Sequence, residues 1–188
     1  MSELIATDKK YGIEVDIRSS SKELIIHHDP LSNGNSFEEW LSHYKHGTLI
    51  LNVKEEGLEP SILKLLDKYS IEDFFFLDQS FPFLVKWAEL GLRKAAVRVS
   101  EFEEIGTAQR LAGKIDWVWV DCFTHLALTR CEAESLTDAG FKLCLVSPEL
   151  QGRDPEISIP HMALVLKERG IIMHAVCTKR PDIWEKTL

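Results

Sequence analysis

Two acidic side chains near the start of the chain stand two positions apart in the segment GIEVDIR, residues 12–18. Alternate residues of a strand share one face, so Glu14 and Asp16 are expected to project together, with Arg18 next on the same side. Two inward-facing carboxylates repel each other unless positive charge lies between them. Either a divalent cation with oxygen ligands, or a buried ion pair with Arg18 or Lys54, would supply that charge.

Strands are needed to position these side chains, and apolar runs of strand length recur along the chain. Most of the runs are rich in Val, Ile and Phe and are apolar throughout, which is typical of strands that a parallel sheet buries on both faces. The expected strands are Gly12–Ile17, Glu23–His27, Thr48–Val53, Asp73–Leu77, Ala95–Val99, Trp117–Val120, Lys142–Val146 and Ile171–Cys177.

Segments with helical periodicity separate most of these strands. Apolar residues recur at i, i+3, i+4 and i+7 from Phe37, and similar spacings start at Ile62 and Phe83. Shorter helices are expected at Glu101–Leu111, Glu132–Ala139 and His161–Arg169. Capping-box residues mark the start of the first helix, and Gly91, Gly140 and Gly170 stand where left-handed helix caps are expected. The alternation of strand and helix predicts a parallel α/β domain.

The residues that follow the strands favour a barrel over an open sheet. Seven strands in succession lead into polar, mostly ionisable residues, among them Asp78, Arg98, Asp121 and Glu149. A TIM-type (β/α) barrel gathers its site on the carboxyl-terminal rim of all its strands, whereas an open doubly wound sheet gathers it near one switch point. The sequence also lacks the glycine-rich GxGxxG and GxxxxGK[ST] nucleotide loops.

The length of 188 residues is short for such a barrel, which commonly has about 250. With Glu23–His27 set aside as a hairpin arm, seven helix-separated strands remain, and Leu4–Thr7 is the only material for an eighth. The barrel is therefore expected to be lopsided, open by one strand, or closed by a partner chain. One domain over residues 1–188 is expected at this size.

Residues 12–54 resemble a known family. GIEVDIR followed by LIIHHDP, residues 24–30, is similar to the glycerophosphodiester phosphodiesterases of the phospholipase C-like phosphodiesterase superfamily. That family has an E-x-D pair on an early strand, a strand ending in His-Asp, and an E-x-K pair on the next barrel strand, here Asn52-Val53-Lys54. The resemblance implies a TIM barrel, in agreement with the strand-end argument.

The resemblance also implies roles for individual residues. Glu14 and Asp16 match two metal ligands, for Mg²⁺ or Ca²⁺, and Asn52 stands where a third, carboxylate ligand is expected. An amide oxygen can coordinate either ion, although it brings no charge and would weaken the site. Lys54 matches a lysine that neutralises phosphate, and His28 matches one of two catalytic histidines.

The second catalytic histidine of the family lies in an N-terminal His-Arg-Gly strand, and the residues before Glu14 contain nothing similar. Phosphodiester cleavage needs both an activated nucleophile and a protonated leaving group, and one missing acid or base costs about 10²–10⁴-fold in rate. His27, His125 and Glu149 are possible substitutes, and His27 is the weaker choice because it alternates in face with His28.

Basic residues at strand ends are candidate phosphate ligands together with Lys54. Arg18 and Arg98 are the two that we assign to phosphate, and Lys179 is a further candidate. Pairing with a rim carboxylate is the alternative for such a residue. The rim carboxylates Asp78, Asp121 and Glu149 could in turn be metal ligands or structural hydrogen-bond acceptors.

Composition narrows the class of protein. The chain has 22 Lys and Arg against 30 Asp and Glu, a net charge of −8, which argues against a nucleic-acid partner. No apolar run approaches the ~20 residues of a membrane span, and Met1–Leu4 does not resemble a signal peptide. Without CxxC spacing no zinc knuckle is expected, and Cys122, Cys144 and Cys177, in or beside apolar runs, are interpreted as small core residues in a reducing compartment. A cytoplasmic protein, with a homo-oligomer as one option, is therefore expected.

Two functions remain open from the sequence. The first is metal-dependent hydrolysis of a small phosphodiester, resembling a glycerophosphodiester, by acid–base catalysis at the barrel rim, with a role in lipid metabolism. The second is a non-catalytic barrel that binds a phosphorylated ligand. Glu14, Asp16, His28 and Lys54 together favour the first, while the missing histidine and the amide at position 52 favour the second.

Overall fold

The computed structural model of the chain describes residues 2–20 and 23–187. Its contacts divide the chain into two compact units, Met1–Leu90 and Gly91–Leu188, which are described separately. Both units are built from strands that alternate with helices, as predicted for an α/β protein. One domain over residues 1–188 stays a prediction.

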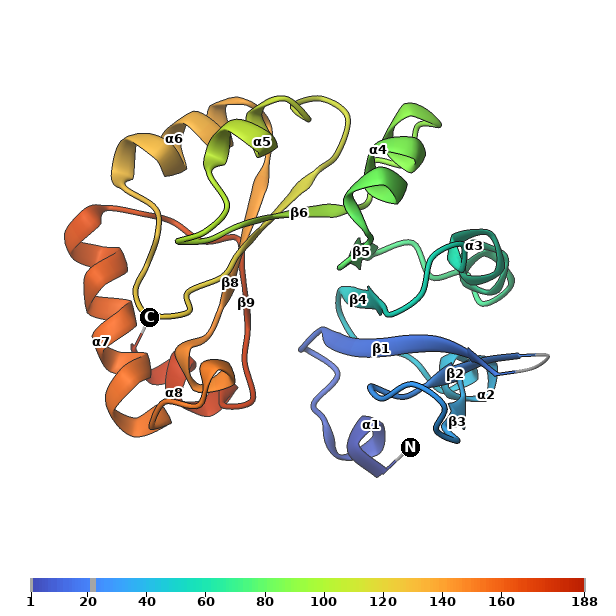
Figure 1. Cartoon of the computed structure of the whole chain (residues 1–188). Coiled ribbons are helices and arrows are strands. Elements are labelled where there is room, and N and C mark those ends of the chain that lie inside the picture. The colour runs from blue at the N-terminus through green and yellow to red at the C-terminus, as the bar shows by residue number, and fades with distance from the viewer. Residues whose placement is uncertain (1, 21–22, 188) are drawn as a thin grey trace. The chain divides into compact units, whose positions relative to one another are not determined.

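The first unit contains a mixed sheet with the strand order β3-β2-β1-β4-β5 (Figure 1). The strands β1, β4 and β5 are parallel, while β2 and β3 form an antiparallel extension beside β1. Their bounds are β1 (Ile13–Ser20), β2 (Glu23–Ile26), β3 (Asn35–Ser36), β4 (Leu49–Val53) and β5 (Phe74–Leu77). The helices are α1 (Ser2–Ala6), α2 (Phe37–Ser42), α3 (Glu59–Lys68) and α4 (Phe81–Glu89).

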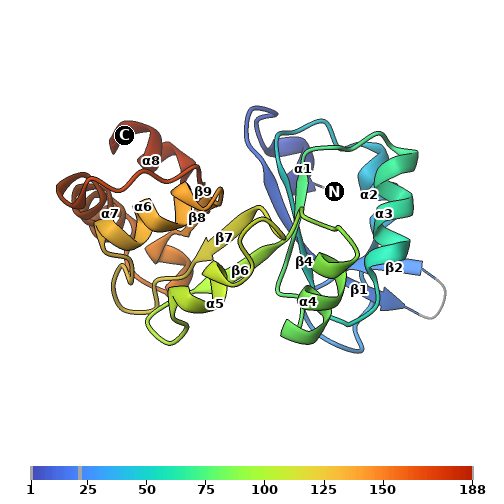
Figure 2. The ribbon, with the colours of Figure 1, turned by 90° about the horizontal axis from the view of Figure 1, so that it is seen from above.

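One face of this sheet carries the apolar core of the first unit. Val15 and Ile17 of β1 share a face with Leu51 and Val53 of β4, because the strands pair in register, and all four are buried. The helices α2 and α3 pack against each other beside the sheet (Figure 2) and bury Phe37, Leu41, Ile62 and Leu66. The opposite face of β1 is left for Glu14 and Asp16.

The second unit is a four-stranded parallel sheet in the order β6-β7-β8-β9. Its strands are β6 (Ala96–Val99), β7 (Trp117–Val120), β8 (Lys142–Val146) and β9 (Ala175–Cys177). The helices α5 (Ile105–Gln109), α6 (Arg130–Asp138) and α7 (Pro155–Arg169) lie along one side of the sheet (Figure 1), and the 3₁₀ helix η1 (Pro148–Gln151) and α8 (Pro181–Thr187) complete the unit.

The predicted elements agree closely with the structure, with several corrections. The helix expected from Glu101 is α5 and begins at Ile105, and the helix expected from His161 is α7 and begins at Pro155, after the cap residue Asp154. Leu4–Thr7, considered for an eighth strand, lies mainly in α1, which satisfies backbone hydrogen bonds within the segment and still buries Leu4. The last strand begins at Ala175 rather than Ile171, because residues 171–174 form the connection between the glycine cap of α7 and the strand. The predicted caps are present: Ser36 accepts from the Glu39 N–H, and Gly91, Gly140 and Gly170 have positive φ.

The four cysteines are free, and the predicted core position is confirmed for Cys122 and Cys144. Cys122 and Cys144 are buried, Cys177 is half-buried and Cys131 is exposed. Burial raises the pKa of both Cys122 and Cys144 to about 12, so these thiols stay protonated and act as small core residues.

Every helix within residues 2–20 and 23–187 is too short or too polar to cross a membrane.

Candidate functional site

Pairing of β1 with β4 brings the predicted acidic pair together with Asn52. The parallel register sets Asp16 opposite Asn52 and Glu14 opposite Ile50. Residues paired in this way point to the same side of a sheet, and Glu14 and Asp16 alternate with the core residues of β1. The three polar side chains therefore share the sheet face that lies opposite the α2–α3 core.

Glu14 and Asn52 are in direct contact. Asn52 Nδ2 donates a hydrogen bond of 2.9 Å to Glu14 Oε1, and the Asn52 side chain is buried. Burial raises the pKa of Glu14, the negative charge of Asp16 raises it further, and the Asn52 hydrogen bond partly offsets both effects. Glu14 is therefore a carboxylate that a positive charge would stabilise.

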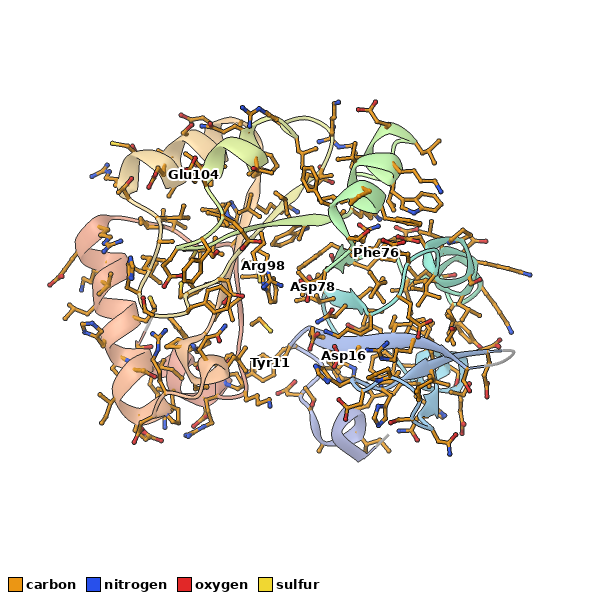
Figure 3. The ribbon with its side chains drawn as sticks, viewed as in Figure 1. Tyr11, Asp16, Phe76, Asp78, Arg98 and Glu104 are labelled. Atoms are coloured by element: carbon orange, nitrogen blue, oxygen red, sulfur yellow. The ribbon has the colours of Figure 1, made fainter. Side chains whose placement is uncertain are left out.

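Lys54 supplies positive charge beside Asp16. Its Nζ lies 3.0 Å from Asp16 Oδ1 and 3.9 Å from Asp78 Oδ2, so one ammonium group lies between carboxylates from two strand ends. Asp16 and Asp78 are both labelled in Figure 3. Asp78 has a φ of 57°, a left-handed conformation that costs energy for a residue other than glycine and is tolerated best by Asp and Asn. The ion pair with Lys54 considered from the sequence is thus present.

Arg18 joins three backbone segments around this cluster. Its Nε donates to the His28 carbonyl at 2.9 Å and one terminal nitrogen donates to the Lys54 carbonyl at 3.4 Å. The same nitrogen lies 3.6 Å from Glu55 Oε1. The guanidinium group therefore holds the segment after β2 against the segment after β4, and its predicted contact with phosphate stays a prediction.

His28 reaches the cluster through its backbone rather than its ring. The imidazole side chain is 73% exposed, and its Nδ1 lies 2.9 Å from Asp29 Oδ1. The hydrogen bond to His28 lowers the pKa of Asp29. The preceding residue, His27, donates its backbone N–H to the Asp16 carbonyl at 3.1 Å, which fixes this turn against β1. No described contact joins the His28 ring to Glu14 or Asp16.

The donor set fits a hard divalent cation in its chemistry. Glu14 and Asp16 offer carboxylate oxygens, and Asn52 Oδ1 is buried without a hydrogen-bond partner, which leaves an amide oxygen available as a third ligand. Across residues 2–20 and 23–187, no cluster of three or more His, Cys, Asp and Glu side chains is arranged to hold a metal. A site here would therefore depend on the amide of Asn52.

The polar residues at the strand ends of the second unit are largely engaged with one another. Arg98, labelled in Figure 3, lies 3.4 Å from the buried Asp121, whose other oxygen accepts from Gln151 Nε2 and the Cys122 N–H. Arg98 thus shows the pairing with a rim carboxylate that the sequence left open, and its assignment to phosphate stays a prediction.

Glu149 and Glu101 each brace loops of the second unit. Glu149 accepts from Ser147, from the Thr178 hydroxyl at 2.5 Å and from the Lys179 N–H at 3.0 Å, and so ties the segments after β8 and β9 together. Burial alone would raise the pKa of Glu101, but hydrogen bonds from backbone N–H groups, including that of His125, lower it to about 2. Both carboxylates act as structural acceptors in this arrangement.

Sequence reasoning missed a buried carboxylate in the first unit and its contact with the half-buried Gln79. Glu59, at the start of α3, is 1% exposed and accepts a hydrogen bond of 2.7 Å from Gln79. An acidic residue in the first turn of a helix is common, and the sequence carries no signal that its side chain turns inward.

Comparison with known proteins identifies the fold. No family model and no curated protein matches the chain. Similar solved structures include one assigned as a glycerophosphoryl diester phosphodiesterase from Agrobacterium tumefaciens, with 14% identity, a TM-score of 0.65 and coverage of 92% of this chain and 83% of the other. A glycerophosphodiester phosphodiesterase from the same species has 13% identity, a TM-score of 0.63 and coverage of 94% and 85%.

A glycerophosphoryl diester phosphodiesterase from Parabacteroides distasonis also has 13% identity and a TM-score of 0.63, with coverage of 94% of this chain and 74% of the other. At such identities the likeness is one of fold. It agrees with the resemblance predicted independently from residues 12–54 and with the alternation of parallel strands and helices. The chain therefore has the TIM-barrel type of α/β fold found in the glycerophosphodiester phosphodiesterases.

Proposed function

We propose that the chain is a metal-dependent phosphodiesterase that hydrolyses a small glycerophosphodiester-like substrate. The observation that carries this proposal is the position of Lys54 beside Asp16, on the sheet face that also holds Glu14 and Asn52. Carboxylate and amide oxygens next to an ammonium group can bind a divalent cation and a phosphate together. The fold shared with glycerophosphodiester phosphodiesterases supports the same reaction class.

In this proposal Glu14, Asp16 and Asn52 hold Mg²⁺ or Ca²⁺. A bound divalent cation supplies Lewis-acid stabilisation of charge on the phosphoryl oxygens. Lys54 adds a second positive charge to the same oxygens, and its three N–H donors allow it to contact Asp16 and phosphate together. Arg18 holds the Lys54 carbonyl and thereby positions this residue.

His28 is the proposed proton carrier. Its Nδ1 is paired with Asp29, which fixes one ring nitrogen and leaves Nε2 to give or take a proton. The exposed ring can reach a substrate that enters from solvent. The Arg18 bond to the His28 carbonyl holds the backbone close to the carboxylate cluster.

Binding of a phosphorylated ligand without turnover is the second candidate. Two observations favour it: Asn52 stands where the resemblance expects a carboxylate, and the His28 ring has no described contact with Glu14 or Asp16. The same residues would then serve for recognition alone. A cytoplasmic location, a homo-oligomeric state and a role in lipid metabolism remain proposals under either function.

Cation binding is tested by measuring the melting temperature of the full chain with Mg²⁺, Ca²⁺ and Mn²⁺. A cation that binds the native state raises the melting temperature with its occupancy. We expect Asp16→Asn to lose this rise, while Asp67→Asn, which changes an exposed carboxylate of α3, should keep it. A wild-type protein that none of the cations stabilises would contradict the metal site.

Catalysis is tested by following cleavage of glycerophosphodiesters with the cation that binds. We expect His28→Asn to lower kcat by about 10²–10⁴-fold, as the loss of a general acid or base does. Cation binding without cleavage of any diester would instead support the non-catalytic function. Cleavage that His28→Asn leaves unchanged would remove the proton-transfer role from this residue.

A further inference from the structure

A cavity of about 210 Å³ lies at the carboxyl ends of β4 and β5, within the first unit. It is formed by the segments that lead from these strands into α3 and α4. Its lining includes Lys54, Glu56, Glu59, Asp78, Gln79 and Phe83. A water molecule takes about 30 Å³ of liquid volume, so the cavity has room for a short organic group. Lys54 and Asp78 also belong to the candidate site, which the cavity therefore adjoins.

Glu59 and Gln79 bring unsatisfied acceptor oxygens to this cavity. Gln79 Nε2 donates to Glu59 Oε1 at 2.7 Å, which joins the two side chains. Glu59 Oε2 and Gln79 Oε1 are both buried and have no hydrogen-bond partner. Buried polar atoms are almost always hydrogen-bonded, so a donor is missing from this pair.

The charge of Glu59 is also unbalanced. Among the described residues no Lys, Arg or His forms an ion pair with it, although its side chain is buried. Lys54 points its Nζ at Asp16 and Asp78 instead. The other acids of the lining have partners: Glu56 accepts from the Ser80 hydroxyl at 2.6 Å, and Glu55 accepts from Ser19. A buried carboxylate without a counter-charge is costly, so the cavity favours a ligand that is both cationic and a hydrogen-bond donor.

We propose that this cavity binds a primary ammonium group, with Glu59 as its counter-ion and Gln79 Oε1 as a second acceptor. An ammonium group carries three N–H donors and no acceptor, which matches two acceptor oxygens that lack donors. The ring of Phe83 provides an apolar wall for the carbon chain that bears the ammonium.

The position beside Lys54 extends the proposal to a substrate class, and this extension rests on the proposed function. A phosphodiester held at Lys54 would direct one of its two alcohol groups toward Glu59. The preferred diester is then one whose alcohol carries a primary amine. A free amine of similar size would use the same contacts, so the two sources of the ammonium group need separate tests.

A proton on Glu59 is the competing explanation for the two unsatisfied oxygens. A protonated Oε2 could donate to Gln79 Oε1 and complete a cyclic carboxylic acid–amide pair. The cavity would then be without charge at Glu59 and indifferent to ammonium ions. Binding measurements separate the two explanations.

The first experiment titrates the full chain with 2-aminoethanol and with choline, its trimethylated form, and follows binding by NMR. We expect 2-aminoethanol to bind at least about tenfold more tightly than choline, which has no N–H donor. Glu59→Gln should weaken 2-aminoethanol by about 10–100-fold, while Glu39→Gln, an exposed first-turn acid of α2, should have no effect.

Glu59→Gln is suited to this test because the new amide can donate to Gln79 Oε1 and still accept from Gln79 Nε2, so it should remain folded. A folded Glu59→Gln variant that binds 2-aminoethanol as well as wild type overturns the proposal. Equal binding of choline overturns it as well, because choline has no N–H donor. Failure of 2-aminoethanol to bind at all overturns it and favours the proton on Glu59.

The second experiment compares cleavage of glycerophosphodiesters whose second alcohol is 2-aminoethanol, choline or glycerol. A preference for the 2-aminoethanol ester of about tenfold in kcat/KM, lost in Glu59→Gln, supports the substrate class. Cleavage of all three esters with equal kcat/KM overturns the substrate class while the proposed function stands. Binding of 2-aminoethanol through Glu59 without cleavage of any ester overturns the proposed function and leaves the ammonium site as a receptor for a free amine.

Discussion

At the scale of single residues, the candidate site concentrates negative charge around few donors. Glu14 and Asp16 of β1 and Asp78 after β5 approach Lys54 and Asn52, and Lys54 supplies a full positive charge to Asp16 and Asp78. Such an arrangement is less stable without a ligand than with one, because like charges raise the energy of the ionised carboxylates. Substitutions at these residues should therefore change the stability of the ligand-free protein and its affinity for a ligand in opposite directions.

Glu14→Gln should stabilise the ligand-free protein at neutral pH. Burial and Asp16 raise the pKa of Glu14 above its ordinary value of 4.5. A carboxyl group with a raised pKa gives its full contribution to stability below pH 4.5 and loses it as the pH rises through the folded-state pKa. Melting temperatures of the variant and the wild type should be measured from pH 3 to 8, about five units that include the reference carboxyl pKa. We expect the variant to melt at a higher temperature than the wild type at neutral pH, and this difference should disappear in acid. A gain independent of pH would show that charge is not its cause.

Asn52→Asp should strengthen cation binding and lower the stability of the ligand-free protein. The substitution keeps the shape of the side chain, removes the hydrogen bond to Glu14 and adds a buried negative charge beside it. We expect a loss of about 1–3 kcal/mol in unfolding free energy without cation, recovered when Ca²⁺ or Mg²⁺ is added. Chemical denaturation with and without cation measures both effects. The exposed Asn33→Asp serves as the control and should change neither.

The sequence predicts part of this cluster, and the reason is geometric. Alternation along β1 predicts that Glu14 and Asp16 share a face, and the family resemblance adds Asn52, which the pairing of β1 with β4 sets opposite Asp16. The approach of Asp78 to Lys54 depends on a single left-handed residue, and the inward turn of Glu59 depends on packing at the start of α3. Neither feature has a periodic signature in the sequence.

At the scale of elements, the register of β1 against β4 determines which side chains meet. Gly12 immediately precedes β1 and lies against Thr48, which immediately precedes β4. A Cβ atom at position 12 would lie 2.3 Å from the Thr48 carbonyl oxygen, far inside contact distance. The absence of a side chain at Gly12 therefore allows the two strands to begin side by side.

Gly12→Ala should consequently destabilise the protein and weaken the site together. We expect a loss of about 1–3 kcal/mol in unfolding free energy, because the backbone of one strand must move. The stabilising effect of cations should fall with it, since Asp16 and Asn52 would separate. Gly106→Ala is the matched control: no atom lies within 4 Å of the added Cβ, and alanine in α5 should be neutral or stabilising. Both variants can be compared by chemical denaturation.

Element prediction succeeded where periodicity was strong and failed where segments were short. Buried strands such as β5, which is Phe-Phe-Phe-Leu, have a composition that few helices share. By contrast, α1 spans five residues and β3 two, and in such short segments tertiary contacts decide between helix and strand. Leu4–Thr7, the only material for an eighth strand, is such a short segment and lies mainly in α1.

At the scale of the whole molecule, the count of strands was predictable and their closure was not. Strands β1, β4 and β5 of the first unit and β6 to β9 of the second make the seven helix-separated strands expected from the sequence. Closure of a barrel depends on strand tilt and stagger, quantities that hydrophobic patterning does not encode. The proposal of one domain therefore needs a test of its own.

A single domain predicts one cooperative unfolding transition for the full chain. In differential scanning calorimetry the calorimetric and van 't Hoff enthalpies should agree, as they do for two-state domains. Fragments corresponding to residues 1–90 and 91–188 should then fail to fold alone. Two separate transitions, each reproduced by one fragment, would instead identify the two compact units as independent domains.

The difference in exposure among the cysteines makes one of them, Cys131, a site for selective chemical labelling. Cys122 and Cys144 are shielded and stay protonated, whereas Cys131 is open to solvent in the first turn of α6. A maleimide dye or nitroxide added in modest excess would therefore modify the α6 position ahead of the interior sulfurs. Spectroscopic reporters could be introduced into the native sequence without first replacing any residue.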